Sequence, residues 1–138
     1  MIDYTHSTET ITVDNLNGFF VDWPNPPSPE THLALLINSA EIVLAVDNET
    51  RAVVGFITAI SDKILTAYIP LLEVLPAYQG QGVGKELTRR MLARLSKLYM
   101  VDLLCDPELQ SFYTQFGMKP ASGMLLRNYE HQSGVKVD

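Results

Sequence analysis

The sequence has little of what would cross-link a protein or anchor it in a membrane. It contains one cysteine, Cys105, in 138 residues, which excludes an internal disulfide and favours a reducing, cytoplasmic setting. No apolar run approaches the length of a membrane span. The N-terminus has neither the basic start nor the apolar stretch of a signal peptide. We therefore expect no membrane partner.

Basic residues are also few. Ten Lys and Arg stand against 16 Asp and Glu, giving a formal net charge of −6. Phosphate contacts need clustered Lys and Arg, so we expect no nucleic-acid partner. The histidines at His6, His32 and His131 show no metal-ligand spacing, so no metal is expected. An acidic surface instead raises the local concentration of a cationic substrate.

Length and composition predict a single domain over residues 1–138. Hydrophobic residues make up 46% of the chain and charged residues 19%, which is typical of a globular protein. A chain of this length buries a core without disulfides or metals. The polar segment 131–138 is expected to be a loose C-terminal tail.

Helix signals begin in the N-terminal third. Thr12 is a candidate cap for a short helix over 12–20. Prolines between residues 24 and 29 then impose a non-helical loop. Ser28 followed by Pro29 predicts the start of a second helix, because this pair suits the N-cap and first helical positions.

The remainder alternates between strand and helix patterns. The apolar side chains between residues 83 and 98 recur at helical spacing, which predicts a long amphipathic helix. The apolar run 100–105 predicts a strand covered on both faces. The predicted strands are 41–46, 52–60, 64–75, 100–105 and 123–129, with helices over 83–98 and 107–116.

This order predicts an α/β (α+β) fold with a mixed central sheet flanked by helices. The first three predicted strands follow one another through short connections and suit antiparallel pairing. The unit spanning residues 64–105 is strand, helix, strand, and it suits a parallel crossover.

A glycine cluster lies between the strand 64–75 and the long helix. In Gln79-Gly80-Gln81-Gly82-Val83-Gly84-Lys85, glycines allow a tight turn, and free N–H groups at the helix start point toward an anion. A tight turn without a ligand is the alternative. Two familiar phosphate loops do not fit, because a P-loop needs Gly at position 79 and Ser or Thr at 86, and a dinucleotide fingerprint needs Gly at 85.

Two motifs carry a resemblance to a known superfamily. Gln79-x-x-Gly82-x-Gly84 resembles the pyrophosphate motif of the GNAT N-acetyltransferases, and the strand end 72–76 is similar to their coenzyme-contacting strand. The segment 111–118 resembles their F-Y-x-x-x-G-F motif, with Met118 in place of the last aromatic residue. Residues 103–106 leading into the second motif are similar to the arylalkylamine N-acetyltransferases, although this motif does not fix the substrate.

The resemblance implies a GNAT acyl-CoA N-acyltransferase fold and a function. Acetyl-CoA would be the cosubstrate, and the acetyl group would pass directly to a primary amine of a small molecule or peptide. The implied coenzyme contacts are the strand residues Leu72, Glu73 and Val74 and the loop residues Gln79, Gly80, Gln81, Gly82, Val83, Gly84 and Lys85.

The sequence indicates the catalytic residues less clearly than the coenzyme contacts. The resemblance implies that Tyr113 protonates the leaving thiolate, although its helical spacing with Phe112 and Phe116 equally suits core packing. The slots where relatives hold a base contain Tyr68 and Pro70. Glu73 is the nearest carboxylate and is a candidate catalytic residue or a partly exposed strand acid, and water is another proton acceptor.

The acceptor site is expected near the N-terminal helices. Phe19, Phe20 and Trp23 are candidate substrate-binding residues, with a small satellite core as the alternative. Cys105 is expected to be a buried structural cysteine rather than a nucleophile. Two alternative functions stay open. The protein could be an acyltransferase that uses another acyl-CoA, or a CoA-binding sensor or degenerate, non-catalytic domain. A homodimer also stays open, because the sequence does not define the oligomeric state.

Overall fold

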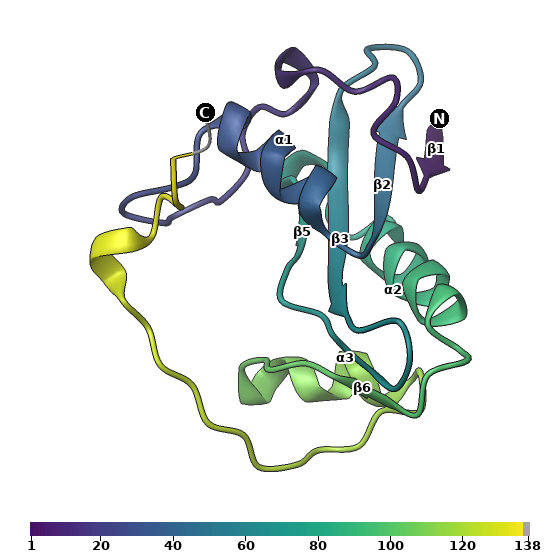
Figure 1. Ribbon diagram of the computed structural model, residues 1–138. Helices are drawn as coiled ribbons and strands as arrows, with labels where there is room; N and C mark the ends of the chain where they lie inside the picture. Colours follow the sequence, from purple (N-terminus) through teal and green to yellow (C-terminus); the bar gives the residue numbers. More distant parts are fainter. Residues whose placement is uncertain (137–138) are drawn as a thin grey trace.

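The computed structural model describes residues 1–136 (Figure 1). In chain order the strands and helices are β1 (Ile2–Thr5), α1 (Pro29–Asn38), β2 (Glu41–Asp47), β3 (Val53–Ser61), β4 (Thr66–Tyr68), β5 (Leu72–Val74), α2 (Val83–Arg94), β6 (Met100–Asp102) and α3 (Gln110–Thr114). Single 3-10 turns lie at Val13–Asn15, Pro76–Tyr78, Pro107–Leu109 and Tyr129–His131. Within the described residues, every helix is too short or too polar to cross a bilayer.

The sheet is mixed, as the sequence predicts. Its strand order is β1-β2-β3-β4-β6, and β5 pairs with β3 beside β4. Neighbouring strands are antiparallel except for β4 and β6, which are parallel and are joined through α2. The predicted crossover is therefore confirmed. The edge strand β1 carries no clear alternation and was not expected.

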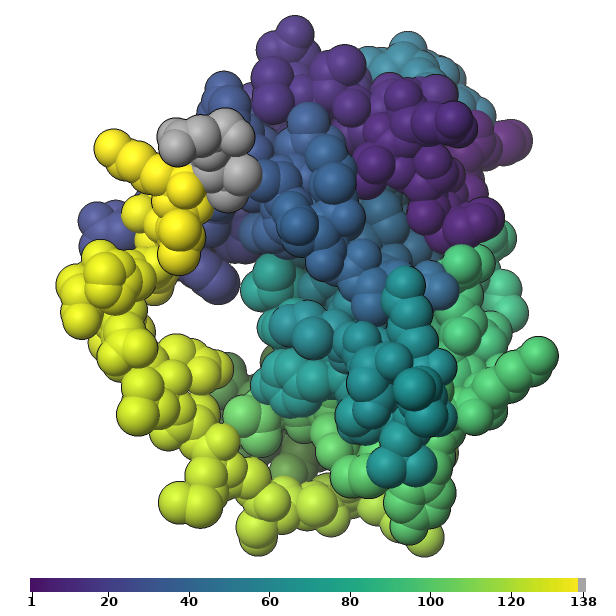
Figure 2. All heavy atoms as spheres, in the orientation of Figure 1, coloured from purple at the N-terminus to yellow at the C-terminus, as the bar shows by residue number. Residues whose placement is uncertain are grey.

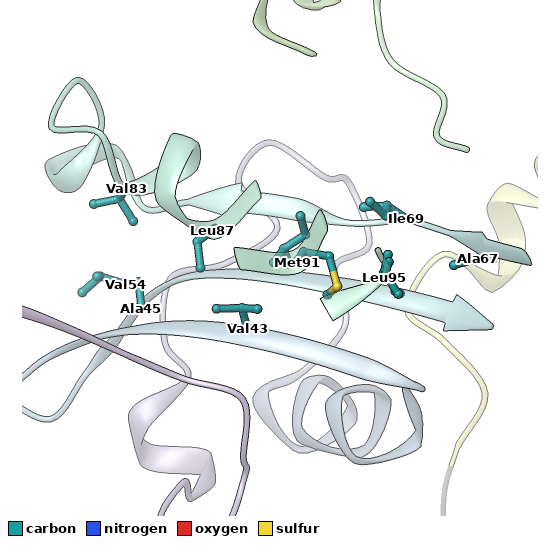
Figure 3. Close-up of a cluster of buried hydrophobic side chains, with 11 residues drawn as sticks. Val43, Ala45, Val54, Ala67, Ile69, Val83, Leu87, Met91 and Leu95 are labelled. Atoms are coloured by element: carbon teal, nitrogen blue, oxygen red, sulfur yellow. The ribbon is translucent and has the colours of Figure 1, made fainter. Parts of the chain in front are cut away.

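Helices cover both faces of the sheet (Figure 1). The expected α2 stripe lies on one face, where Leu87 and Met91 pack against Val43 and Ala45 of β2 (Figure 3). Gly55 of β3 makes this approach possible, because a Cβ there would lie 3.0 Å from Leu87 Cδ1. On the other face, α1 packs with Leu36 against a second cluster.

An unusual member of the second cluster is His32 of α1. Its side chain is 1% exposed and packs against Phe19, Phe20 and Phe56, at ring-centroid distances of 5.2, 5.0 and 4.4 Å. In the part of the chain that the structure describes, its Nε2 atom has no hydrogen-bond partner. Burial lowers the pKa of His32 from 6.5 to about 4, so the imidazole is neutral at pH 7.

Stability should therefore fall on mild acidification. In the unfolded chain His32 binds a proton below its ordinary pKa of 6.5, whereas in the folded chain it does so only near pH 4. The stability that the buried neutral imidazole contributes is therefore fully present above pH 6.5 and is lost as the pH falls toward 4. The free energy of unfolding should drop by about 2 kcal/mol between pH 7 and pH 5. Urea unfolding at both values tests this, and His32→Leu should remove most of the difference. An equal pH difference in that variant would assign the effect to other groups.

The predicted helix over 12–20 is wrong. Only the 3-10 turn Val13–Asn15 forms, because the Asn15 side chain accepts hydrogen bonds from the N–H and the hydroxyl of Thr12. The chain then turns through positive φ angles at Gly18, Phe20 and Asp22 (+90°, +62° and +66°), which no α-helix contains. The segment becomes an irregular loop.

The predicted strand 64–75 is divided into two. Pro70 lacks the N–H that would continue the ladder, and the chain leaves β4 at Ile69 before joining β3 again as β5. The predicted strand 100–105 is also shorter than expected, since only Met100–Asp102 pairs. Met100 and Leu104 are exposed, so this region is not covered on both faces.

The predicted last strand over 123–129 does not form. Instead residues 118–127, here named the C-terminal arm, run in an extended path that stands off the body in yellow-green (Figures 1 and 2). The first part of the expected loose tail makes contacts, because Gln132 Oε1 accepts a hydrogen bond of 2.8 Å from Asn25 N. Residues 137–138 of that tail lie outside the described residues.

Candidate functional site

The sheet opens where β5 and β6 would otherwise be neighbours. β6 pairs with β4 as far as Asp102, and the last bond across this pair joins Ile69 N to Asp102 O at 2.9 Å. Beyond this point β5 pairs with β3 and not with β6. Within residues 1–136, the outer edge of β5 has no partner strand, as expected for a strand that bonds a ligand through its backbone.

A cleft occupies this opening. It has a volume of about 310 Å³. Pro70 and Leu72 line one wall, Leu104 and Cys105 line the other, and Tyr113 of α3 contributes from the end. The structure therefore brings together one predicted coenzyme-strand residue and the predicted acid, although they are about forty residues apart in the sequence.

The glycine loop begins directly after β5. Gln79 Nε2 donates to Val74 O at 3.0 Å, which ties the loop back to the strand. Gly80 and Gly82 have φ angles of +77° and +82°, and Gly82 caps α2. In the described chain, the N–H groups of residues 80–85 donate to no protein acceptor. Six free donors at the start of a 12-residue helix form a cradle suited to an anion.

The loop and the cleft are adjacent. A Cβ at Gly84 would lie 3.7 Å from Val74 and 3.9 Å from Phe112, so the first turn of α2 contacts both β5 and α3. Tyr113, next to Phe112, faces the cleft. A ligand held by the loop can therefore extend along β5 toward the Tyr113 hydroxyl.

Tyr113 is partly buried beside Cys105. Burial raises the pKa of Tyr113 above 10, and the nearby Cys105 raises it further. The phenol therefore keeps its proton at neutral pH, as a proton donor must. Cys105 is half-buried and lines the cleft, which corrects the expectation of a fully buried structural cysteine.

Glu73 serves a purpose that its sequence position does not reveal. It lies opposite Phe56 of β3, and its carboxylate accepts hydrogen bonds from Phe20 N at 2.8 Å and Val21 N at 3.3 Å. One side chain thus ties the coenzyme strand to the N-terminal loop, 53 residues away. Hydrogen bonds to an ionised acceptor are the stronger kind.

Removing the hydrogen bonds of Glu73 should loosen the N-terminal loop more than it weakens coenzyme binding. Glu73→Ala should lower the free energy of unfolding by about 1–3 kcal/mol, because two backbone donors lose a charged acceptor. It should also raise the KM for the acceptor and leave the CoA dissociation constant unchanged, since β5 keeps its backbone. Glu9→Ala, at an exposed acid, is the control. Loss of turnover at unchanged KM, together with loss of the acidic limb of the pH profile, would indicate instead that Glu73 is the base.

The three predicted aromatic residues are in different environments. Phe19 and Phe20 pack on His32 and Phe56, inside the second cluster. Trp23 is 38% exposed and lies 4.9 Å from the Phe20 ring. It lines a hollow of about 300 Å³ with Thr31 and Leu71. Phe19 and Phe20 thus support the loop, and Trp23 is the member that a ligand can contact.

The two positions at which relatives hold a catalytic base contain no ordinary base in this chain. Tyr68 lies on β4 and Pro70 at the break between β4 and β5. Sequence reasoning did not single out Asp106 and Arg127, which line the cleft with opposite charges. Asp106 had a usable signal, because it is the last residue of the segment 103–106 that leads into the second motif. Arg127 had none, because its place depends on the path of the C-terminal arm.

Comparisons with known proteins agree with this geometry. The model of the acetyltransferase (GNAT) family matches residues 9–118. A provisionally named acetyltransferase of Deinococcus radiodurans R1, solved by crystallography, is 46% identical and superposes with a TM-score of 0.95, covering 99% of this chain and 94% of that one.

Two curated relatives are more distant. The chain is 29% identical over 119 residues to the uncharacterized N-acetyltransferase ycf52 of Porphyra purpurea, covering 83% of this chain and 68% of the relative. It is 29% identical over 111 residues to the histone acetyltransferase TAP1 of Glycine max, covering 72% of this chain and 47% of the relative. The chain thus spans about half to two thirds of the length of these relatives.

The chain belongs to the acetyltransferase (GNAT) family, whose model covers most of its length. The mixed sheet, the parallel crossover and the flanking helices are the GNAT fold, and the family resemblance drawn from the two motifs is confirmed. This membership identifies an acyl-CoA-dependent N-acetyltransferase.

Proposed function

We propose that the protein transfers an acetyl group from acetyl-CoA directly to a primary amine of a small molecule or peptide. The observation that carries this proposal is the cleft between β5 and residues 103–106, which Tyr113 lines, together with the glycine loop that follows β5. The loop N–H groups would hold the pyrophosphate, and the unpaired edge of β5 would bond the pantetheine arm. When bound, acetyl-CoA supplies the thioester.

The residues of the chain then have separate tasks in the transfer. The neutral amine attacks the thioester carbonyl carbon, a C–N bond forms and the C–S bond breaks. Tyr113 gives its proton to the departing thiolate and regains one from water. The proton lost by the amine passes to water or to Asp106, because Tyr68 and Pro70 supply no ordinary base. The products are an acetylated amine and CoA.

The acceptor enters beside Trp23 in this proposal. The net charge of −6 raises the concentration of cations near the surface, and the exposed Trp23 face suits cation–π contact with an ammonium group. Glu73 holds the backbone of this loop against β5, so the loop is positioned relative to the acetyl donor. A cytoplasmic location stays a prediction.

A screen of amines against matched alcohols and carboxylic acids tests the acceptor class. We expect acetylation of amines only, weakened by added salt and by Trp23→Ala. The rate should rise with pH toward the pKa of the free amine, since only the neutral amine attacks. Acetylation of another class, or amine turnover unaffected by both salt and Trp23→Ala, would contradict the proposed acceptor. CoA binding without any turnover would favour a sensor.

A further inference from the structure

The hollow beside Trp23, here named the Trp23 hollow, lies on the α1 side of the sheet. Its walls come from Trp23 of the N-terminal loop, Ala34 and Leu35 of α1, Leu71 between β4 and β5, and Val135 near the C-terminus. Figure 1 shows the C-terminal segment beside α1 and the loop that precedes it. The volume of about 300 Å³ equals that of about ten water molecules, so a group of about ten non-hydrogen atoms fits.

The walls of the Trp23 hollow are uncharged. Among the described residues that line it, none carries a formal charge. Its polar side chains already have partners within the protein. Thr31 Oγ1 accepts from Ser28 Oγ at 3.2 Å, Asn38 Nδ2 donates to Ala34 O at 2.8 Å, and Gln132 Oε1 accepts from a backbone N–H at 2.8 Å. A charged group would lose water here without gaining an opposite charge, whereas an apolar group loses nothing.

The aromatic wall of the hollow is held in place by the protein itself. Phe20 has a φ of +62°, which a non-glycine residue adopts only where its surroundings hold it. Trp23 N donates to Phe20 O at 3.2 Å, and the two rings lie 4.9 Å apart. The Glu73 carboxylate fixes the same loop through Phe20 N. The hollow is thus formed in advance, so a ligand spends little of its binding energy on ordering the wall.

The hollow is next to the cleft that holds Tyr113. Leu71 lines the hollow and packs with the second cluster, whereas Leu72 lines the cleft and packs with the first cluster on the α2 side. Adjacent Cα atoms are about 3.8 Å apart, so the two spaces are separated by the width of one residue. Leu71 O accepts from Thr58 N of β3 at 3.1 Å, which fixes this divide. A molecule in the hollow can therefore extend one end past Leu71 toward the cleft.

We propose that the Trp23 hollow binds the uncharged, apolar tail of the acceptor, so that the enzyme prefers monoamines with such a tail over diamines and polyamines. The tail packs against Trp23, Leu35 and Leu71, and the amine nitrogen reaches past Leu71 to the thioester. The inference rests on the proposed function, to which it adds the class of amine. The acidic surface attracts the single ammonium group, and the uncharged hollow rejects a second one.

The fluorescence of Trp23 tests binding without any acetyl transfer, because Trp23 is the one tryptophan of the chain. Straight-chain amines from ethylamine to octylamine are titrated into the full chain without coenzyme. We expect the dissociation constant to fall roughly 3–4-fold for each added methylene. Diaminohexane should bind more weakly than hexylamine by roughly 10-fold or more. Affinity that is independent of tail length, or equal affinity for diaminohexane and hexylamine, would overturn the inference.

Variants that fill the hollow provide a matched test. Ala34→Phe should raise the dissociation constant of octylamine by roughly 10-fold or more and change that of ethylamine little, because only the longer tail needs the space. Ile37→Phe is the control, since Ile37 lies on the same helix, is 61% exposed and does not line the hollow. Unchanged binding of octylamine to folded Ala34→Phe, or an equal loss in Ile37→Phe, would contradict the assignment of the tail to this hollow.

A change of charge tests the selectivity in the opposite direction. Asn38→Asp places a carboxylate on the wall with almost no change in size, so diaminohexane should bind roughly 10-fold more tightly and hexylamine should gain less. Failure of the variant to favour the diamine would contradict an uncharged wall as the cause of selectivity.

Turnover then separates this inference from the proposed function. With acetyl-CoA present, kcat/KM should follow the same order as binding, with octylamine above hexylamine and both above diaminohexane. Tail-dependent binding without acetylation of any amine would support the hollow and contradict the proposed function. Acetylation of diaminohexane as readily as hexylamine would support the proposed function and overturn the inference.

Discussion

Replacing Tyr113 with phenylalanine should lower the rate of acetyl transfer by roughly 10²–10⁴. The ring and its edge-on contact with Phe112, at 5.0 Å, are kept, so only the proton is lost. Without it, the thiolate must leave unprotonated or wait for water. Single-turnover kinetics with a fixed amine measure the loss.

The proton transfer is energetically reasonable. A free thiol has a pKa of about 8.5 and a tyrosine about 10, a mismatch of about 2 kcal/mol. Burial raises the pKa of Tyr113 further. The same burial disfavours the charged thiolate of CoA and so raises the pKa of its thiol as well. Tyr113→Phe should therefore leave the CoA dissociation constant and the folding free energy nearly unchanged. Tyr99→Phe, at an exposed tyrosine, is the control, and full turnover by Tyr113→Phe would assign Tyr113 to packing alone.

Replacing Gly82 with valine should abolish CoA binding. Gly82 has a φ of +82°, and apart from its own and adjacent residues, no atom of the described chain lies within 4 Å of where its Cβ would be. The valine side chain would therefore enter open space at the start of α2, where the proposed function places the pyrophosphate. Titration calorimetry on the folded variant measures the loss.

Gly117→Val is a matched control for the effect of backbone strain in Gly82→Val. Gly117 has a φ of +89° and equally open surroundings, but it lies after α3 and outside the loop. A β-branched residue at either position costs about 1–2 kcal/mol through its left-handed backbone. Gly117→Val should therefore be destabilised similarly and still bind CoA. Equal affinity in the two variants would show that the loop does not hold the coenzyme.

The regular elements were predictable where one local signal dominates. The Ser28-Pro29 pair starts α1, and the Ser28 hydroxyl accepts from Thr31 N at 3.1 Å. The apolar stripe of α2 is buried as its spacing implies. Glycines at the junction after β5 adopt the left-handed backbone that their position suggests.

The misjudged elements depend on partners distant in sequence. The helix expected over 12–20 gives way to a loop whose N–H groups bond to Glu73, and no local pattern reveals that contact. The strand expected over 123–129 has the side chains of a strand, but in the described chain its path stands off the sheet and its backbone bonds to no neighbouring strand. Tyr113 was found through its motif, whereas Arg127 reached the cleft through the path of the arm.

The most direct test of the account is the stoichiometry of transfer from acetyl-CoA to an amine. Free CoA and acetylated amine should appear in equal amounts with the wild type, as followed by thiol titration and mass spectrometry. Tyr113→Phe should slow both products equally, and Gly82→Val should yield neither at coenzyme concentrations that saturate the wild type. CoA release without acetylated amine, or wild-type rates in both variants, would contradict an acetyltransferase that works through the glycine loop and Tyr113.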